Sequence, residues 1–564
     1  LTAPSTLVND TVMSTQPVAT IKDADGNTVT SGSDSTQTVT LTSTNATISG
    51  TTSMAAVGGV ADFNGKGVKL RGLIGARNLT ATISSPSTIT GTASVTITYG
   101  TANKVVLTTP AAGFVNRTDF TTQPVVQIQD VSGNVVANAT DNVTISIDSG
   151  TLTGSNKTVA AVNGVATFAG IGKTGTIGSK TITFTSGSLA TDSQTFTLTH
   201  GAAAQVAVTL PSSVSSGFAL SAQPIATIQD ADGNTVTSGA QSTQTVTLSS
   251  PDSTISGTVS MAAVAGVANF TGKGVTLSGT AGSRTITAAI ASPSAITGSA
   301  LITVLPGIAY SLGITAPATA TVGVNFSSDV VVTIYDQWNN VVTVGGDSYA
   351  TISLAATGLT GTISKAATNG VATFSGLQLN TTAGVNIINV SMSGRAVTTS
   401  TTVTLSVGAA DSLRSEQSIG ATTQNRVNFA SQPKIAVIDK GGNIVSVNGV
   451  NITVAASGSG TAIGGTTTAT TVNGVATFTN LQPRGTKYAT SAQAYVLTFT
   501  PDNGLTAITQ STNLTTGPVA DLYVWMPTTA QTNGVTFTGD LFVNLMDLDG
   551  NTMLGDTTTT VTVS

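Results

Sequence analysis

Apolar and polar residues alternate in short runs along most of the chain, which is the period of a half-buried β-strand. Val143, Ile145 and Ile147 alternate with polar residues, and Ile182 and Phe184 do the same further on. Clusters of Gly, Asn, Asp and Ser interrupt these runs roughly every 8–12 residues, as turns do between short strands. Long stretches with the 3.6-residue period of a helix are not seen. The pattern predicts an all-β chain.

One stretch recurs six times, at intervals of about one hundred residues, which indicates a tandem array of whole domains. An apolar/polar alternation leads into an aspartate, then a Gly-Asn turn, then a second alternation, as in 223–236. A unit of this size can bury a core of its own. The anchoring aspartates are Asp23, Asp130, Asp230, Asp336, Asp439 and Asp547.

A second motif, Gly-Val-Ala-x-Phe, follows the first in five of the copies and predicts a β-hairpin. In Asn163-Gly164 the two turn residues are those that adopt the positive φ of a type I′ turn. Val and Phe at an offset of three lie on opposite faces of a strand, and we expect Phe in the core and Val at a covered edge. Seven or eight strands per hundred residues predict an immunoglobulin-like sandwich. A barrel remains the alternative. The motifs are Gly59–Phe63, Gly164–Phe168, Gly266–Phe270, Gly370–Phe374 and Gly474–Phe478.

The repeats predict six domains that join through about one glycine each, with no long linker between them. Such short junctions predict little bending and an extended rod. The first copy lacks its N-terminal edge. The sixth matches only about half a domain, whose remainder we expect either beyond Ser564 or supplied by another subunit. The predicted domains are 1–100, 101–201, 202–307, 308–408, 409–518 and the partial 519–564.

Composition narrows the functional classes. Only 8% of the residues are charged and the net charge is −5, so no basic stripe is available to bind nucleic acid. The chain has no cysteine, which excludes disulfides and thiol chemistry. No apolar run reaches the roughly 18 residues of a membrane span. A surface of Thr and Ser hydroxyls is typical of an extracellular or cell-surface protein.

The Asp-x-Asp-Gly-Asn form of the first motif could begin a calcium loop, because alternating carboxylates suit a hard cation. However, Ser132, Trp338 and Gly441 replace the second aspartate in the other copies, and no distal Glu follows. The alternative is a turn whose first aspartate caps backbone N–H groups. We favour turn capping over calcium, and we expect no other cofactor. The candidate metal ligands are Asp23, Asp25, Asp230, Asp232, Asp547 and Asp549.

Other candidate chemistry is sparse. His200 is the only histidine and lies at a predicted domain junction, with no nucleophile motif beside it. Trp338 could stack on a sugar, but we expect it to pack on the neighbouring domain, and we expect Trp525 in a core. Sequons for N-linked glycans occur at Asn45, Asn138, Asn142, Asn156, Asn325 and Asn389, among others. We predict no enzymatic activity.

The pairing of Asp-x-x-Gly-Asn-x-Val (23–29, 130–136 and 230–236) with Gly-Val-Ala-x-Phe resembles bacterial immunoglobulin-like repeats. These occur in invasin- and intimin-like surface proteins and in repeat-built surface-layer or fibre proteins. Repeat four departs from the pattern, with Asn339 at the position of the turn glycine. The resemblance implies a stalk, an adhesin or a layer-forming protein.

These features lead to one main hypothesis and three alternatives. The main hypothesis is a non-enzymatic extracellular structural protein that associates with copies of itself, with attached glycans as further partners, to build a surface layer, sheath or fibre. The alternatives are the stalk of a bacterial adhesin whose binding tip lies elsewhere, a spacer in a secreted polysaccharide-degrading enzyme, and a virion fibre.

Overall fold

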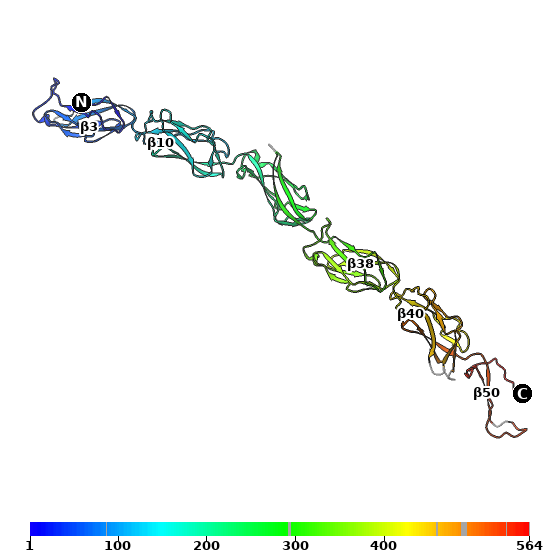
Figure 1. The fold of residues 1–564 in the computed structure, drawn as a ribbon. Coiled ribbons are helices and arrows are strands. Elements are labelled where there is room, and N and C mark those ends of the chain that lie inside the picture. The colour runs from blue at the N-terminus through cyan, green and yellow to red at the C-terminus, as the bar shows by residue number, and fades with distance from the viewer. Residues whose placement is uncertain (86, 292–294, 458–460, 487–492, 537–538, 563) are drawn as a thin grey trace. The chain divides into compact units, whose positions relative to one another are not determined.

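The computed structural model describes all residues except 86, 292–294, 458–460, 487–492, 537–538 and 563 (Figure 1). The described chain is almost entirely β-structure, with three short 3₁₀ helices. It forms five successive β-sandwiches and a final hairpin, so the prediction of an all-β tandem array of immunoglobulin-like sandwiches is confirmed. We number the sandwiches in chain order.

The first two sandwiches lie between Leu1 and Leu198. The first contains β1 (Thr6–Val8), β2 (Val18–Thr20), η1 (Ser33–Thr36), β3 (Thr38–Ser43), β4 (Ala46–Ser49), β5 (Ser53–Ala55), β6 (Val60–Asp62), β7 (Lys69–Gly72), β8 (Gly75–Ile83) and β9 (Ile89–Thr98). The second contains β10 (Lys104–Thr109), β11 (Val125–Gln129), β12 (Asn142–Ile147), β13 (Thr151–Leu152), β14 (Thr158–Ala160), β15 (Val165–Thr167), β16 (Lys173–Thr174), β17 (Gly178–Thr185) and β18 (Asp192–Leu198).

The third and fourth sandwiches have similar orders of elements, but the third has one additional short strand, β21. The third contains β19 (Ala203–Thr209), β20 (Ser213–Ser215), β21 (Phe218–Ala219), β22 (Ile225–Asp230), η2 (Ala240–Thr243), β23 (Thr245–Ser249), β24 (Thr254–Ser256), β25 (Ser260–Ala262), β26 (Val267–Asn269), β27 (Thr276–Ser278), β28 (Gly282–Ile290) and β29 (Ile296–Leu305). The fourth contains β30 (Ser311–Thr315), β31 (Thr319–Thr321), β32 (Val330–Tyr335), η3 (Gly346–Tyr349), β33 (Thr351–Ala355), β34 (Leu359–Thr360), β35 (Ser364–Ala366), β36 (Val371–Phe374), β37 (Gln378–Leu379), β38 (Gly384–Met392) and β39 (Thr398–Ser406).

The fifth sandwich precedes the final hairpin. It contains β40 (Ser412–Gln417), β41 (Thr422–Gln424), β42 (Lys434–Ile438), β43 (Asn451–Ser457), β44 (Thr461–Gly464), β45 (Thr468–Thr470), β46 (Val475–Thr477), β47 (Gln482–Gly485), β48 (Gln493–Pro501) and β49 (Ile508–Thr515). The hairpin consists of β50 (Asp521–Trp525) and β51 (Phe542–Met546).

Each complete sandwich pairs a small sheet with a larger one. In the fourth, β30-β32-β36 form the small sheet and β31-β39-β38-β33-β35 the large one. The strand that opens the fourth sandwich is therefore split, and its second part, β31, pairs parallel with the last strand, β39. The first and fifth sandwiches have the same parallel pair, β1 with β9 and β41 with β49. The first strand thus contributes one segment to each sheet.

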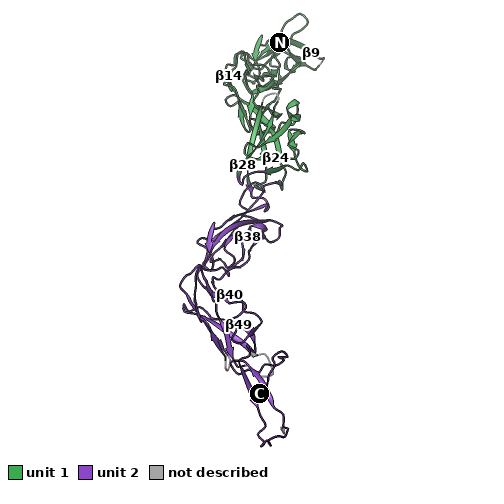
Figure 2. Ribbon diagram, turned by 90° about the vertical axis from the view of Figure 1, so that its right-hand side faces the viewer, with its two compact units in different colours: residues 1–214, 219–277, 283–303 green, residues 215–218, 278–282, 304–564 purple. Residues whose placement is uncertain are grey.

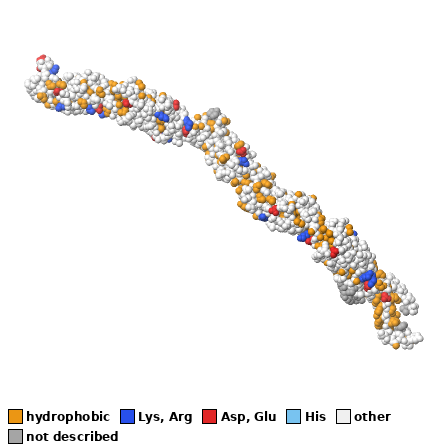
Figure 3. All heavy atoms as spheres, viewed as in Figure 1, with side chains coloured by type: hydrophobic (Ala, Val, Ile, Leu, Met, Phe, Trp, Pro, Cys, Tyr) orange, Lys and Arg blue, Asp and Glu red, His pale blue; other side chains and the backbone are white. Residues whose placement is uncertain are grey.

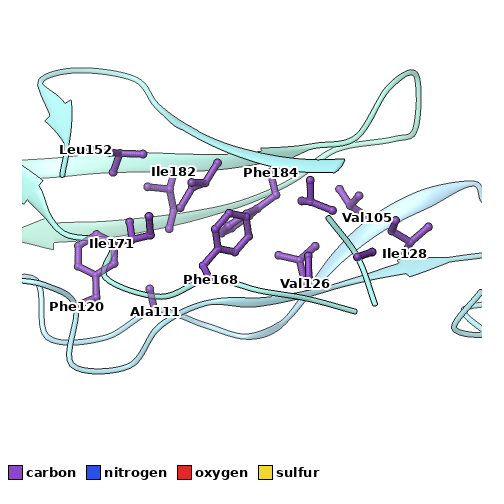
Figure 4. Close-up of a cluster of buried hydrophobic side chains, with 14 of the residues drawn as sticks. Val105, Ala111, Phe120, Val126, Ile128, Leu152, Phe168, Ile171, Ile182 and Phe184 are labelled. Atoms are coloured by element: carbon purple, nitrogen blue, oxygen red, sulfur yellow. The ribbon is translucent and has the colours of Figure 1, made fainter. Parts of the chain in front are cut away.

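The core of each sandwich lies between its two sheets, as the second sandwich shows (Figure 4). The Phe168 ring is 1% exposed and its centroid lies 5.7 Å from that of Phe184. The phenylalanine of every Gly-Val-Ala-x-Phe motif is at most 2% exposed, whereas the valine is only half-buried. The prediction of Phe in the core and Val at an edge is confirmed. Burial of such a ring stabilises the fold by about 1.5–3 kcal/mol.

The hairpin turns also have the predicted geometry. Asn163 and Gly164 have φ values of 54° and 79°, the positive values that a type I′ turn requires. In the third sandwich the first of these positions is Ala265, with φ of 48°. An L-residue other than Gly, Asn or Asp rarely adopts this conformation.

Hydroxyl groups cover the exposed face of the large sheets. Cross-strand pairs such as Thr40 Oγ1–Ser53 Oγ at 2.9 Å and Thr144 Oγ1–Thr158 Oγ1 at 3.0 Å recur at equivalent positions. Charged side chains are few and scattered on the face drawn in Figure 3. The hydroxyls satisfy one another across the sheet, which is why this surface needs few charges.

The chain divides into two compact units (Figure 2). The first comprises Leu1–Val214, Ala219–Leu277 and Ser283–Thr303, and the second comprises Ser215–Phe218, Ser278–Gly282 and Val304–Ser564. Among the described residues, no helix has the length and apolar character needed to cross a membrane.

The final hairpin corrects one prediction. Trp525 is 45% exposed, although we expected it in a core. It lies near Phe542, with ring centroids 5.8 Å apart, on a sheet that contains only β50 and β51 in the described chain. Since no second sheet packs on this pair within the described residues, a side chain with the sequence pattern of a core position stays accessible.

Candidate interdomain junction

The recurring Asp-to-Asn stretch forms a closed five-residue turn, which we call the clamp turn. In Asp130–Asn134, the Asp130 N–H donates to the Asn134 carbonyl at 2.9 Å, and the Gly133 N–H donates to the Asp130 carbonyl at 3.1 Å. Asp130 Oδ1 accepts the N–H groups of Ser132 and Asn134, both at 2.9 Å. Gly133 has φ of 89°. One carboxylate oxygen thus caps its own turn, as an Asx motif does.

The second carboxylate oxygen binds the glycine that connects one sandwich to the next. Gly201 N–H donates to Asp230 Oδ2 at 2.9 Å. The other four junctions repeat this bond, namely Gly100 to Asp130 at 2.8 Å, Gly307 to Asp336 at 2.7 Å, Gly408 to Asp439 at 2.8 Å and Gly517 to Asp547 at 2.8 Å. The motif therefore lies at the junctions and is more than a turn within one domain.

The connecting residues must be glycines because there is no room for a Cβ atom at these positions. A Cβ added to Gly201 would lie 2.6 Å from the Asn116 carbonyl oxygen, and one on Gly408 would lie 2.2 Å from that of Val322. A real Cβ atom essentially never has a contact that short, so the chain must shift to admit any side chain. The single-glycine connection in the sequence is the signature of this close approach.

The preceding sandwich presents a two-residue corner pair to the clamp turn. The pair follows the strand segment that runs parallel to the last strand, and the second residue has a positive φ in every case, for example 61° at Arg117. A hydrogen bond from the Thr118 N–H to the Val115 carbonyl closes this corner at 3.2 Å. The corner pairs are Asn9-Asp10, Asn116-Arg117, Ser216-Gly217, Val322-Gly323 and Asn425-Arg426.

Where the corner pair begins with asparagine, its side chain bridges the two sandwiches. Asn116, which is 1% exposed, donates from Nδ2 to Asp230 Oδ2 and to Asp232 Oδ2, both at 2.8 Å. Its Oδ1 accepts the Gly175 N–H at 3.1 Å. Asn425 makes the equivalent bonds to Asp547 and Asp549. These amide groups are buried and fully used, as buried polar groups must be.

The asparagine that ends the clamp turn binds back to the preceding sandwich. Asn234 Nδ2 donates to the Gly175 carbonyl at 2.9 Å, and its Oδ1 accepts the Ile177 N–H at 3.0 Å. The same two-way contact joins Asn134 with Gly72 and Ile74, Asn340 with Gly279 and Ala281, and Asn443 with Thr381 and Ala383. Each of these side-chain amides donates one hydrogen bond to the backbone of the preceding sandwich and accepts one from it, as paired backbone groups in a sheet do, and so fixes the clamp turn against that sandwich.

The third residue of the clamp turn matches the second residue of the corner pair. Asp232 faces Arg117, which donates from Nε to Oδ2 and from Nη2 to Oδ1, each at 2.9 Å. Asp549 forms the same two contacts with Arg426. Trp338 instead lies against Gly217, where an added Cβ would meet the indole ring at 2.2 Å. An aspartate at this position is thus paired with an arginine, and the large Trp338 ring is paired with a glycine, which has no side chain.

The charges at the junction are stabilised by these bonds. Burial by itself raises the pKa of Asp230, but the donors Gly201, Asn116 and Asn234 outweigh it, so the pKa lies below its ordinary value. The pKa of Asp130, Asp439 and Asp547 is lowered in the same way. The hydrogen bond from Arg117 holds the pKa of Asp232 far below its usual range. Each carboxylate is thus held in its charged form.

The six candidate calcium ligands occupy the clamp turns of the first and third sandwiches and of the final hairpin. The oxygens of Asp230 and Asp232 accept N–H groups of Gly201, Asn116 and Arg117. Asp547 and Asp549 are bound alike, while Asp23 and Asp25 are exposed. In the part of the chain that the structure describes, no three His, Cys, Asp or Glu side chains gather as a metal site. Calcium binding, which we did not favour over turn capping, stays an untested alternative.

His200 is part of the same junction as Arg117. Its Nδ1 lies 3.0 Å from the Gly201 carbonyl oxygen and its Nε2 lies 2.9 Å from Ser238 Oγ. Trp338 packs across a junction as expected, on Gly217. The six sequon asparagines named above are all exposed.

Sequence reasoning missed the corner pairs entirely. Asn116 and Arg117 lie in a loop with no alternation and no motif, and their partners are more than one hundred positions away. One signal was available, because Arg stands in the corner pair only where the next clamp turn has Asp at its third position, as Arg117 with Asp232 and Arg426 with Asp549.

The fold and its junctions define a tandem immunoglobulin-like protein. No protein family and no curated protein sequence matches the chain. Among solved structures, invasin, described as a bacterial integrin-binding protein, is similar at a TM-score of 0.27 and 13% identity, over 75% of this chain and 80% of its own. The extracellular domain of protocadherin GammaB4 has values of 0.24 and 12%, over 92% and 84% of the two chains. Domains 4–9 of the surface layer protein SbsC have 0.20 and 17%, over 94% and 81%. Likeness at this level says nothing of what the chain binds.

Proposed function

We propose that this chain is a non-enzymatic extracellular structural protein whose immunoglobulin-like domains associate with further copies to build a surface layer, sheath or fibre. In this proposal the domain boundaries are those predicted from the sequence, after Gly100, Gly201, Gly307, Gly408 and Pro518. Attached glycans are the second class of partner in this proposal.

The observation that supports it most is the repeated clamp at the junctions. Asp130, Asp230, Asp336, Asp439 and Asp547 are all at most 2% exposed and all bind the connecting glycine. Buried, charge-assisted hydrogen bonds cost free energy when broken, about 1.5–3 kcal/mol each. A protein whose buried carboxylates all lie at its junctions, among the described residues, is suited to holding its domains in place.

The hydroxyl-rich faces support the same proposal. Pairs such as Thr247–Ser260 and Thr453–Thr468 leave a nearly uncharged surface on sandwich after sandwich. Neutral hydroxyl surfaces can pack against one another without charge repulsion and can carry O-linked sugars.

Electron microscopy of native cells with antibody against this chain tests the proposal. We expect label over a continuous lattice, a sheath or filaments. Diffuse, unassembled label would overturn a layer or fibre. Label confined to the shafts of separate projections that end in another domain would establish the adhesin stalk in its place.

A further inference from the structure

The clamp turn of the first sandwich is a copy of the one in the third. Residues 23–27 and 230–234 both read Asp-Ala-Asp-Gly-Asn. The first turn is also preformed: Asp23 Oδ1 accepts the Asp25 N–H at 3.1 Å and the Asn27 N–H at 2.8 Å, against 3.0 Å for each of the equivalent bonds in the third sandwich.

The two copies differ in what covers them. Asp230 and Asn234 are 1% and 8% exposed, whereas Asp23, Asp25 and Asn27 are all exposed. In the third sandwich the outer oxygens bind Gly201, Asn116 and Arg117. Among the described contacts, Asp23 is bound only by groups of its own turn.

A groove lies beside this turn, and it points to the same ligand. In the second to fifth sandwiches, the strand that follows the connecting glycine pairs with the strand that leads into the clamp turn, as β19 pairs with β22. In the described part of the first sandwich the small sheet consists of β2 and β6, and beside β2 there is a single bridge, from Thr2 to Val18. A cavity of about 260 Å³ opens there, lined by Ile21, Val39, Ile83 and Ile89 among others.

The second sandwich shows what fits such a groove. Val105 of β10 pairs with Ile128, the position equivalent to Ile21, and its N–H donates to the Ala190 carbonyl at 2.9 Å. Val105 is 2% exposed. The groove of the first sandwich therefore has the dimensions and the apolar lining needed to accept a strand with an inward-facing Val or Leu.

We propose that the first clamp turn and this groove form a docking surface for one kind of partner, an immunoglobulin-like domain with an Asn-Arg corner pair that continues through a glycine into an apolar strand. The strand fills the groove beside β2. The asparagine amide and the glycine N–H bind Asp23, and the arginine binds Asp25 through two hydrogen bonds. This inference does not depend on the proposed layer or fibre.

Asp25 sets the choice of partner. The clamp turns with Asp at this position, at Asp232 and Asp549, both receive an Asn-Arg pair. The turns with Ser132, Trp338 or Gly441 receive a corner pair without arginine. A domain whose corner pair is Val322-Gly323 can offer a strand and a glycine N–H but no cation.

The test places residues 101–207 directly before Leu1 of the full chain, because Val208 is the position equivalent to Leu1. Hydrogen-exchange mass spectrometry then follows the peptide that contains β2 and the new peptide that spans the fusion point. We expect both to exchange about tenfold slower or more when the strand docks and the charge-assisted bonds form. The native Gly201–Val208 peptide is the internal standard.

Two comparisons isolate the role of Asp25. D25N should speed exchange of the fusion peptide, whereas D62N, which changes another exposed carboxylate of the first sandwich, should leave it unchanged. A fusion of residues 308–416, with Val322-Gly323 as its corner pair, should protect β2 but show no effect of D25N.

A second fusion guards against misfolding of the first. Residues 409–524 carry Asn425-Arg426 and should give the same protection as 101–207. If β2 exchanges as fast in both fusions as in the unmodified chain, the docking surface is overturned. If β2 is protected but D25N and D62N behave alike, the assignment of arginine to Asp25 is overturned.

Discussion

Arg117 holds Asp232 by two hydrogen bonds of 2.9 Å, although the two residues belong to different sandwiches. The guanidinium side chain is 53% exposed and the carboxylate side chain 18% exposed. Both lie directly beside Asn116 and Asp230, which are buried. The junction therefore has a buried polar centre and a charged rim, and the two parts respond differently to substitution.

At the rim, R117Q should change the relative motion of the second and third sandwiches more than their stability. A half-exposed ion pair contributes about 0–1 kcal/mol, so the urea midpoint should barely move. Amide ¹⁵N relaxation should show the two sandwiches tumbling more independently. R395Q breaks the Arg395–Asp347 pair inside the fourth sandwich and is the control, since it should leave this relative motion unchanged. If R117Q lowered the free energy of unfolding by several kcal/mol, the Arg117–Asp232 pair would be part of the stabilising centre of the junction and not of its exposed rim.

At the buried centre, G201A should destabilise the junction by about 1–3 kcal/mol, because the new methyl group overlaps the Asn116 carbonyl and displaces the Gly201 N–H from Asp230. The measurement is the free energy of unfolding, together with proteolysis at residues 199–203. Gly346 has an ordinary φ and open space around its Cβ position, so G346A is the matched control and should be tolerated. Equal stability of the two variants would contradict the steric requirement.

Stability should depend on acid through the clamp aspartates. The folded-state pKa of Asp130, Asp230, Asp439 and Asp547 lies below the unfolded value of about 3.9. Their contribution is complete above that unfolded value. As the pH falls below about 4, the unfolded chain takes up protons first, and the contribution is lost. Urea midpoints between pH 7 and pH 2 should show a plateau and then a decline. D230N, which removes one such carboxylate, should flatten the decline, and an unchanged slope would count against this origin.

The hairpin of the third sandwich contains a correctable strain. Ala265 has φ of 48°, where the equivalent residues are Gly58, Asn163, Asn369 and Asn473. A265G should stabilise the third sandwich by up to about 1 kcal/mol, since glycine adopts this conformation without a Cβ clash. Chemical denaturation measures the gain. A268G, in the adjacent strand β26, should have the opposite sign because it removes a buried methyl group and adds backbone freedom.

The fold could be predicted because its signals are local. Alternation marks the strands, and the Asn163-Gly164 pair marks a hairpin, since each signal acts within a few residues. Trp525 shows the limit of this reasoning, because alternation identifies an inward-facing position but cannot show whether a second sheet covers it. Its exposure of 45% follows from the two-stranded sheet around it.

The junction could be predicted only in part. The turn-capping role of Asp230 follows from the residues beside it, and the structure shows both of those N–H bonds. Its other oxygen binds Gly201 and Asn116, and nothing in the local pattern joins positions that far apart. The information is present as a match between two loops, Arg117 with Asp232, and becomes legible only when all copies of both are compared.

The match between corner pairs and clamp turns limits which domain duplications can be tolerated in such a gene. Unequal crossing-over that copies one domain creates a new boundary between two ends that did not evolve together. A domain whose corner pair is Asn-Arg can be followed by a domain whose clamp turn has an aspartate at the position of Asp232. An arginine that faced Trp338 instead would lose that carboxylate partner and would collide with the indole. A duplication is therefore tolerated when the copied unit leaves each corner pair facing a clamp turn that matches it. Residues 23–32 and 230–239 are identical and lie two domains apart, which is the spacing of such a unit.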